Sequence, residues 1–503
     1  MHTTGKIYSF LLNKKTLVIA GICLGVIFLL SLWHRYIQSD ENWFGEQAWY
    51  LAHEGVVRIK TMAGIPEYYS RIFIYHPLLI HMGAWMIKAM GWSVYLFKSL
   101  TLFFYLVFFF CLFLYVKLHS PLWNTHHFFL ALFLIAVTPA VITHAFMFRP
   151  EIYVMTWGFL SYTMLSLYFR QKKIKWVFAS AAAASMAFLT TFNASLFCVA
   201  GFLVLLYHKE YKAMGIFALT SLLLCSVSTI EWWSKENFHL FLSQIHSGLE
   251  RKFPDSCQSH PISHFILVKM MNLLNEPQRF FWSDRVFVFS SLFFLSLLLY
   301  FKKLWQQHRL LMLYFFFLVP ALNLLGIDVA ERYLIYLMPY MALLSSAGLL
   351  LMLEEKRKPL LKAMYLLLMA GMIMVAAKMF VFIFSMNNDH VSRHREVVAL
   401  IPGKNLTVVA PWPLIYNEIG KHHFISYKAI EYQEDKTGKK MNGKALFDFI
   451  YEKYHAQYVI VQQTIKNEPD WYPHWFEDKK LIMHHSRYTL FEISGDFLVF
   501  KAI

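Results

Sequence analysis

Two adjacent carboxylates, Asp40 and Glu41, follow the first long apolar run of the 503-residue chain by only a few residues. Because that run ends at Trp33, both acids are expected at a membrane surface, where an unused carboxylate is costly to bury. A carboxylate placed there can act as a general base that takes a proton from an attacking hydroxyl. The simpler interpretation is a pair of solvated acids at the end of a helix.

Three basic residues at other boundaries are candidates for binding a phosphate. Arg149 and Arg332 each stand next to the start of an apolar run, and His76 precedes a proline and an apolar stretch with helical spacing. Arginine binds phosphate through two parallel hydrogen bonds, which a single ammonium group cannot do. The simpler interpretation is structural: Arg149 precedes a helix start, and Arg332 anchors a helix at the membrane interface.

Composition indicates a polytopic α-helical membrane protein. Hydrophobic residues make up 58% of the chain and charged residues only 16%, against about 25% in ordinary soluble domains. The net charge of +16 comes from short basic clusters between apolar runs, so we expect no nucleic-acid partner. Most cysteines lie inside apolar runs, and no disulfide framework is indicated.

Ten charge-free runs are candidates for membrane spans. The run Trp176–Tyr207 would form a helix of about 48 Å, which exceeds a bilayer core of about 30 Å. We therefore expect two helices that turn near Asn193, which gives about eleven transmembrane helices. The ten runs are Leu17–Trp33, Ser99–Val116, Phe128–Phe148, Ile152–Phe169, Trp176–Tyr207, Ala213–Ile230, Val286–Phe301, Leu310–Ile327, Tyr333–Leu353 and Ala363–Ala377.

The distribution of basic residues predicts the orientation. With a cytoplasmic N-terminus, the inside connections hold 17 lysines and arginines, and the short outside connections hold 2. Residues 1–386 are then the transmembrane domain, with outside loops at 34–98 and 232–285. Each loop contains an apolar stretch with helical spacing, after Pro77 and before Pro277, and each stretch is expected to lie on the membrane surface.

Residues 387–503 differ in composition and are predicted to form a small soluble α/β domain outside the membrane. A helix is expected at 444–454, between the first two of its strands. Four short β-type runs are expected to be strands, at 406–411, 458–463, 488–493 and 497–500. The chain contains no Walker or dinucleotide-binding glycine motif, no HExxH and no GxSxG.

Taken together, these motifs resemble the GT-C superfamily of membrane glycosyltransferases. The closest pattern is that of the protein O-mannosyltransferases and the lipid A aminoarabinose transferases. The motifs, in chain order, are Asp40-Glu41 in the first outside loop, His76-Pro77-Leu78, Arg149-Pro150-Glu151 and Glu331-Arg332-Tyr333-Leu334.

The resemblance implies roles for these residues. The catalytic acid lies in the first outside loop, so Asp40 takes the role of the base, with Glu41 as its helper or as a ligand of a possible divalent metal. Aminoarabinose transferases have a Glu-Lys pair where this chain has Tyr75-His76, so that glutamate is absent here. His76 matches the His-Pro of the mannosyltransferases.

The expected function is that of an inverting glycosyltransferase. It would move a sugar from a polyprenyl-phosphate donor to a hydroxyl group of a lipid, glycan or protein acceptor at the outer face of a bacterial inner membrane. The leaving phosphate gains charge, which His76, Arg149 and Arg332 would stabilise. Two alternatives remain, a non-catalytic or polymerase-type protein of surface-glycan assembly and a transporter, although nearly charge-free spans disfavour transport.

The side on which the C-terminus lies can be measured with a reporter fused after Ile503. The basic asymmetry predicts that a reporter active only in the cytoplasm stays silent there. The same reporter inserted at 208–212, a predicted inside connection, serves as the positive control. Cytoplasmic activity after Ile503 would mean that the number of spans is even.

Overall fold

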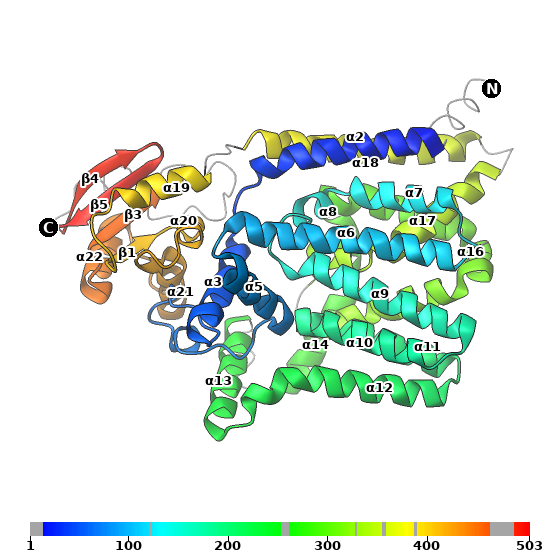
Figure 1. The fold of residues 1–503 in the computed structure, drawn as a ribbon, viewed down its shortest axis with the longest axis horizontal. Helices are drawn as coiled ribbons and strands as arrows, with labels where there is room; N and C mark the ends of the chain where they lie inside the picture. Colours follow the sequence, from blue (N-terminus) through cyan, green and yellow to red (C-terminus); the bar gives the residue numbers. More distant parts are fainter. Residues whose placement is uncertain are drawn as a thin grey trace.

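The computed structural model is a helical bundle that carries a small β-sheet at one end (Figure 1). It describes residues 14–120, 122–252, 261–326, 329–354, 359–386, 390–462 and 487–503. The bundle helices are α2 (Lys14–Ser31), α6 (Val94–Leu118), α7 (Thr125–Ala136), α8 (Pro139–His144), α9 (Pro150–Gln171), α10 (Lys175–Thr190), α11 (Leu196–Tyr207), α12 (Tyr211–Cys225), α16 (Asp284–Leu325), α17 (Met338–Glu354) and α18 (Pro359–Phe384).

Shorter elements connect these helices. The loop at 34–98 forms α3 (Ser39–Glu54), α4 (Pro66–Tyr69) and α5 (Pro77–Met90), and the loop at 232–285 forms α13 (Lys235–Lys252), α14 (Pro261–Leu274) and α15 (Glu276–Phe281). The helices expected from apolar spacing in the two loops, α5 and α14, are thus confirmed as helices. The 3₁₀ turns are η1 (Leu32–His34), η2 (Phe192–Ser195), η3 (Ser226–Trp232) and η4 (Glu331–Tyr336).

The predicted turn near Asn193 is confirmed, because α10 ends at Thr190 and η2 separates it from α11. The predicted span Phe128–Phe148 is wrong: Pro139 starts a new helix, and a proline restricts the residue before it to extended backbone. The runs Val286–Phe301 and Leu310–Ile327 both lie in α16, but non-helical backbone angles at Tyr300 and His308 interrupt it, so each run has its own helical stretch.

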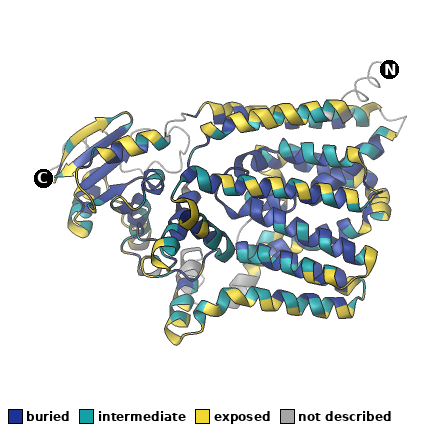
Figure 2. Ribbon diagram, viewed as in Figure 1, coloured by how far each residue is buried: buried dark blue, intermediate teal, exposed yellow. Residues whose placement is uncertain are grey.

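Eleven spans are not confirmed. Among the described residues, four helices are long and apolar enough to cross a membrane, and they are Val94–Leu118, Tyr211–Trp232, Asp284–Leu325 and Pro359–Phe384. The exterior of the bundle is apolar, since α18 is only 22% buried over its most apolar stretch (Figure 2). In contrast, α9 and α17 are buried on almost every face and form the centre. An apolar exterior around an apolar centre is the pattern of an integral membrane protein.

The C-terminal sheet has five strands in the order β2-β1-β3-β5-β4. Strand β1 (Thr407–Ala410) runs parallel to β2 (His423–Ser426) and β3 (Tyr458–Gln462), whereas β5 (Phe497–Ala502) is antiparallel to β3 and β4 (Tyr488–Ser494). The four predicted strands are confirmed, and β2 is an additional one. The helices are α19 (His390–Ala399), α20 (Trp412–Asn417), α21 (Tyr427–Thr437) and α22 (Gly443–Tyr454), the last of which was predicted.

Helix α3 is held between α5 and the C-terminal part of the chain. Gly83 of α5 lies so close to Ala48 that a Cβ added at Gly83 would be 2.9 Å from the Ala48 Cβ. On another side, a Cβ added at Gly45 would overlap the ring of Tyr416 from α20. Two glycines therefore allow α3 to pack closely against both neighbours.

We predict that Gly45→Ala lowers the melting temperature of the purified protein, because the added methyl group meets the Tyr416 ring. Overpacking of this kind costs about 1–3 kcal/mol. The matched control is Gly215→Ala in α12, where nothing lies within 4 Å of the new Cβ; it should be neutral or slightly stabilising. A Gly45→Ala protein as stable as the parent would show that α20 does not dock closely on α3.

Candidate active site

Asp40 and Glu41 lie in the first turn of α3, at the end of the bundle that faces the sheet (Figure 1). The N-cap residue is Gln38, whose backbone N–H donates a hydrogen bond to Glu41 Oε2 at 2.9 Å. Negative side chains are favoured in a first helical turn because unpaired backbone N–H groups point towards them. The sequence analysis did not predict α3, which is too short and too polar to stand out as an apolar run.

Glu41 is fully buried and all its described partners are structural. Lys98 Nζ of α6 lies 2.7 Å from Glu41 Oε2 and also donates a hydrogen bond to the Tyr36 carbonyl at 3.0 Å. The backbone N–H of Phe148 donates to Glu41 Oε1 at 2.9 Å. Glu41 therefore joins α3, α6 and the segment before α9, and its carboxylate does not face open space.

Asp40 differs from Glu41 because its side chain is 44% exposed. Its Oδ2 lies 2.7 Å from Nη1 of Arg149, which is almost completely buried. Arg149 also donates hydrogen bonds to Gln38 Oε1 and to Glu151 Oε1, both at 2.9 Å. The structure thus brings two of the predicted site residues together, with the carboxylate on the accessible side.

Arg332 extends this row of alternating charges. Its Nε lies 4.0 Å from Glu151 Oε1, and its side chain is 37% exposed. The order Asp40, Arg149, Glu151, Arg332 places each charge next to an opposite one. Glu151 was not among the predicted site residues. Its position directly after Arg149-Pro150 was the one feature of the sequence that could have indicated its role.

His76 belongs to the same site. Its ring packs edge-on against Phe44 of α3 at 4.9 Å between centroids, and its Nδ1 has no hydrogen-bond partner in the described structure. Burial lowers the pKa of His76 to about 4, although Glu151 and Asp40 nearby act in the opposite direction. His76 is consequently neutral at pH 7 and would meet a phosphate as a neutral hydrogen-bond partner.

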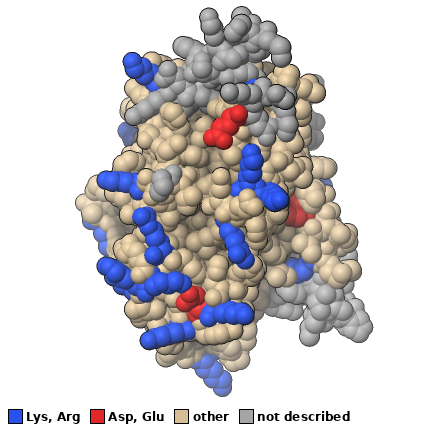
Figure 3. Space-filling view, turned by 90° about the vertical axis from the view of Figure 1, so that its right-hand side faces the viewer, with Lys and Arg blue, Asp and Glu red and all other residues tan. Residues whose placement is uncertain are grey.

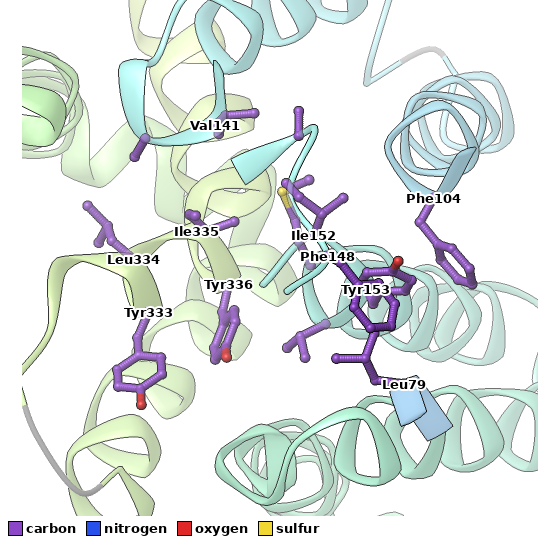
Figure 4. Packing of buried hydrophobic residues seen from close by; sticks show 14 of the residues in the cluster. Leu79, Phe104, Val141, Phe148, Ile152, Tyr153, Tyr333, Leu334, Ile335 and Tyr336 are labelled. Atoms are coloured by element: carbon purple, nitrogen blue, oxygen red, sulfur yellow. The ribbon is translucent and has the colours of Figure 1, made fainter. Parts of the chain in front are cut away.

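Two tyrosines of η4 project towards the site. Figure 4 shows Tyr333 and Tyr336 side by side, pointing to the same side of their backbone. The Tyr333 hydroxyl accepts a hydrogen bond from Asn193 Nδ2 at 3.0 Å, which links η4 to the predicted turn. The buried Tyr336 hydroxyl has no hydrogen-bond partner in the parts of the chain described here.

Side chains of α13 and η3 hold the segment that leads to His76. Gln244 of α13 accepts a hydrogen bond from the Phe73 N–H at 2.9 Å and donates one to the Arg71 carbonyl at 2.7 Å. Arg71 also pairs with Glu231 at 3.2 Å. The two loops therefore form one support around the site.

The residues around Glu41 do not fit a divalent metal. Both carboxylate oxygens accept hydrogen bonds, and the nearest partner is the cation of Lys98. Within the described ranges, no group of three or more His, Cys, Asp and Glu side chains is gathered in ligand geometry.

Comparison with solved structures identifies the fold. The crystal structure of ArnT from Cupriavidus metallidurans bound to undecaprenyl phosphate has a TM-score of 0.55 at 11% identity, over 98% of both chains. The oligosaccharyltransferase of Archaeoglobus fulgidus tethered to an acceptor peptide has a TM-score of 0.55 at 12% identity, over 90% of this chain and 70% of that one. Its complex with an inhibitory peptide and a dolichol-phosphate has a TM-score of 0.50 at 11% identity, over 87% and 69%.

These proteins are GT-C glycosyltransferases, and the chain has the GT-C fold. The resemblance that the motifs indicated is thereby confirmed for the fold. No protein-family model and no curated protein sequence matches the chain.

The Glu41–Lys98 pair predicts a measurable coupling. Glu41→Gln leaves the Lys98 ammonium buried without its counter-ion, and Lys98→Met leaves the Glu41 carboxylate in the same state. Each should destabilise the protein by about 3–5 kcal/mol, whereas the double variant should lose less than the sum of the two. Chemical or thermal unfolding of the four proteins measures this cycle. Additive losses would show that the two side chains do not interact.

Proposed function

We propose that this protein is an inverting glycosyltransferase that uses a sugar carried on a polyprenyl phosphate. The observation that carries the proposal is the position of Asp40. Asp40 is partly exposed and is held by the buried Arg149, whereas Glu41 and Glu151 are buried, and it lies at the end of an apolar bundle. A base for a hydroxyl acceptor needs this combination of a fixed position and access.

Each charged group then has a distinct task. Asp40 takes the proton of the acceptor hydroxyl as that oxygen attacks the anomeric carbon. Arg149 holds the Asp40 carboxylate in place, and Glu151 fixes Arg149 from the other side. Arg332 is more exposed than Arg149, so it is the better placed cation to meet the leaving phosphate. His76, whose charged neighbours include Glu151 and Asp40, would act as a neutral donor.

The ligands of the similar structures support the substrate class. One contains undecaprenyl phosphate, and another contains a dolichol-phosphate, both of which are polyprenyl phosphates. A third carries an acceptor peptide. These ligands agree with a lipid-linked sugar as the donor. They also agree with a hydroxyl group of a lipid, glycan or protein as the acceptor.

Surface charge supports the proposed orientation. Figure 3 views the end of the bundle opposite the sheet, where lysines and arginines gather around few acids. The basic ends of α6, α9 and the start of α10 contribute Lys117, Arg170 and Lys175. We infer that this end faces the cytoplasm, with the active site and the C-terminal domain (387–503) on the outer face of a bacterial inner membrane.

We predict that Asp40→Asn lowers sugar transfer by about 10² to 10⁴, because the amide has no basic oxygen. The assay compares cell-surface lipids, glycans and proteins by mass spectrometry with and without the gene, and then measures single-turnover transfer with the product so identified. Melting curves should change little, since Asp40 is partly solvent-exposed.

The matched control is Glu54→Gln, at the opposite end of α3, where Glu54 pairs with Lys60 on the surface. It should transfer sugar as the parent does. Full activity of Asp40→Asn would show that Asp40 is not the base. The proposal of a transferase would then lose its main support.

A further inference from the structure

Two cysteines from neighbouring helices are in contact at the end of the bundle that faces the sheet. Cys198 lies in the first turn of α11, and Cys225 is the last residue of α12. Both are free thiols in this structure, and the Cys198 thiol forms a hydrogen bond with the Cys225 sulfur. The sequence did not indicate this pair, because both cysteines lie in apolar runs.

Close packing of α11 on α12 brings the two thiols together. A Cβ added at Gly201 of α11 would lie 2.5 Å from the Phe217 ring of α12, so the two helices approach closely there. Only the short connection 208–210 separates the helices, and they run antiparallel (Figure 1). Cys198 shares a helix face with Gly201, and Cys225 shares one with Phe217, because residues three or eight positions apart lie on the same side of a helix.

The pair lies at the same end of the bundle as the candidate active site. Cys198 follows the turn that contains Asn193, whose side chain donates a hydrogen bond to the Tyr333 hydroxyl at 3.0 Å. Cys225 directly precedes η3, whose Glu231 pairs with Arg71 at 3.2 Å. We infer above that this end faces the outer compartment, where thiols close together become oxidised, whereas the cytoplasm keeps them reduced.

Helix α12 is weakly attached to the bundle, although the elements after it support the site. It is only 17% buried over its most apolar stretch, and Leu219 and Leu222 are strongly exposed. Gln244 of α13, beyond η3, nevertheless holds the backbone of Phe73 in the segment that leads to His76. A covalent link between α12 and α11, which itself packs on α16, would fix the start of this support.

From these contacts we propose that Cys198 and Cys225 form a disulfide that fastens α12, η3 and α13 to the bundle. Two S–H bonds break and one S–S bond forms. The two electrons and two protons pass to a membrane-soluble oxidant of the quinone class, which becomes a quinol. The proposal rests on the orientation proposed above and not on the transferase activity.

Differential labelling of the full-length protein tests the disulfide. Membranes of aerobically grown cells are dissolved in denaturing detergent with a first maleimide, then reduced and treated with an isotope-labelled maleimide, and the peptides are analysed by mass spectrometry. Cys198 and Cys225 should carry only the second label, and Cys23 and Cys111 the first. Unreduced digests should contain one peptide that joins Cys198 to Cys225. The first label on both cysteines, or a bond from either to another cysteine, would overturn the proposal.

Melting curves measure what the bond contributes. Reductant should lower the melting temperature of the parent by several degrees, because a cross-link restricts the unfolded chain. It should have no effect on Cys198→Ser or Cys225→Ser, whereas Cys23→Ser, which changes an exposed thiol of α2, should respond as the parent does. Because reductant acts on the parent itself, the test holds even if a variant fails to fold. Equal melting of the parent with and without reductant would contradict a stabilising bond.

Hydrogen exchange tests the link to the site. The Phe73 N–H, which Gln244 holds at 2.9 Å, should exchange about tenfold faster in the reduced protein, because the support around it then opens more often. The Val459 N–H in the centre of the C-terminal sheet is the control and should not change. Equal exchange of Phe73 in both states would show that the bond does not act on the active-site segment. None of these readouts requires sugar transfer to be detected.

Discussion

The site depends on one buried ion pair, between Glu41 and Lys98. Because both side chains are almost completely excluded from water, the pair is stable only while every remaining hydrogen bond is made. The backbone N–H groups of Gln38 and Phe148 and the Tyr36 carbonyl complete these bonds. The same contacts fix the first turn of α3 relative to α6 and α9.

This pairing separates the tasks of two adjacent carboxylates. Glu41 points inward and holds the helix, whereas Asp40, one residue earlier, points about 100° away around the helix axis and reaches solvent and Arg149. The two residues carry the same carboxylate group, but Glu41 stabilises the fold, whereas Asp40, in our proposal, accepts a proton. Burial, and not residue type, makes the difference.

The C-terminal part of the chain completes the support of α3. Glu46, in the middle of α3, accepts hydrogen bonds from the Thr61 N–H and hydroxyl, and the Thr61 carbonyl accepts one from the Ser426 N–H at the end of β2. Burial raises the pKa of Glu46 to about 7. With Tyr416 packed on Gly45, the sheet and the membrane helices hold α3 from two sides.

Much of the architecture followed from local patterns. Composition indicated the membrane class, short β-type runs predicted β1, β3, β4 and β5, and the length of one apolar run required a turn near Asn193. Motif order also indicated the GT-C fold. These features depend on hydropathy and length, which a single sequence contains directly.

Other features depended on tertiary structure. Glu41 and Lys98 are 57 positions apart, and Arg332 meets Glu151 across an even longer separation. The hydropathy of a sequence does not show how one helix is rotated relative to another. It therefore could not show which of the two acids, Asp40 or Glu41, would be buried. The division at Pro139, in contrast, is a local effect of proline that the sequence already contained.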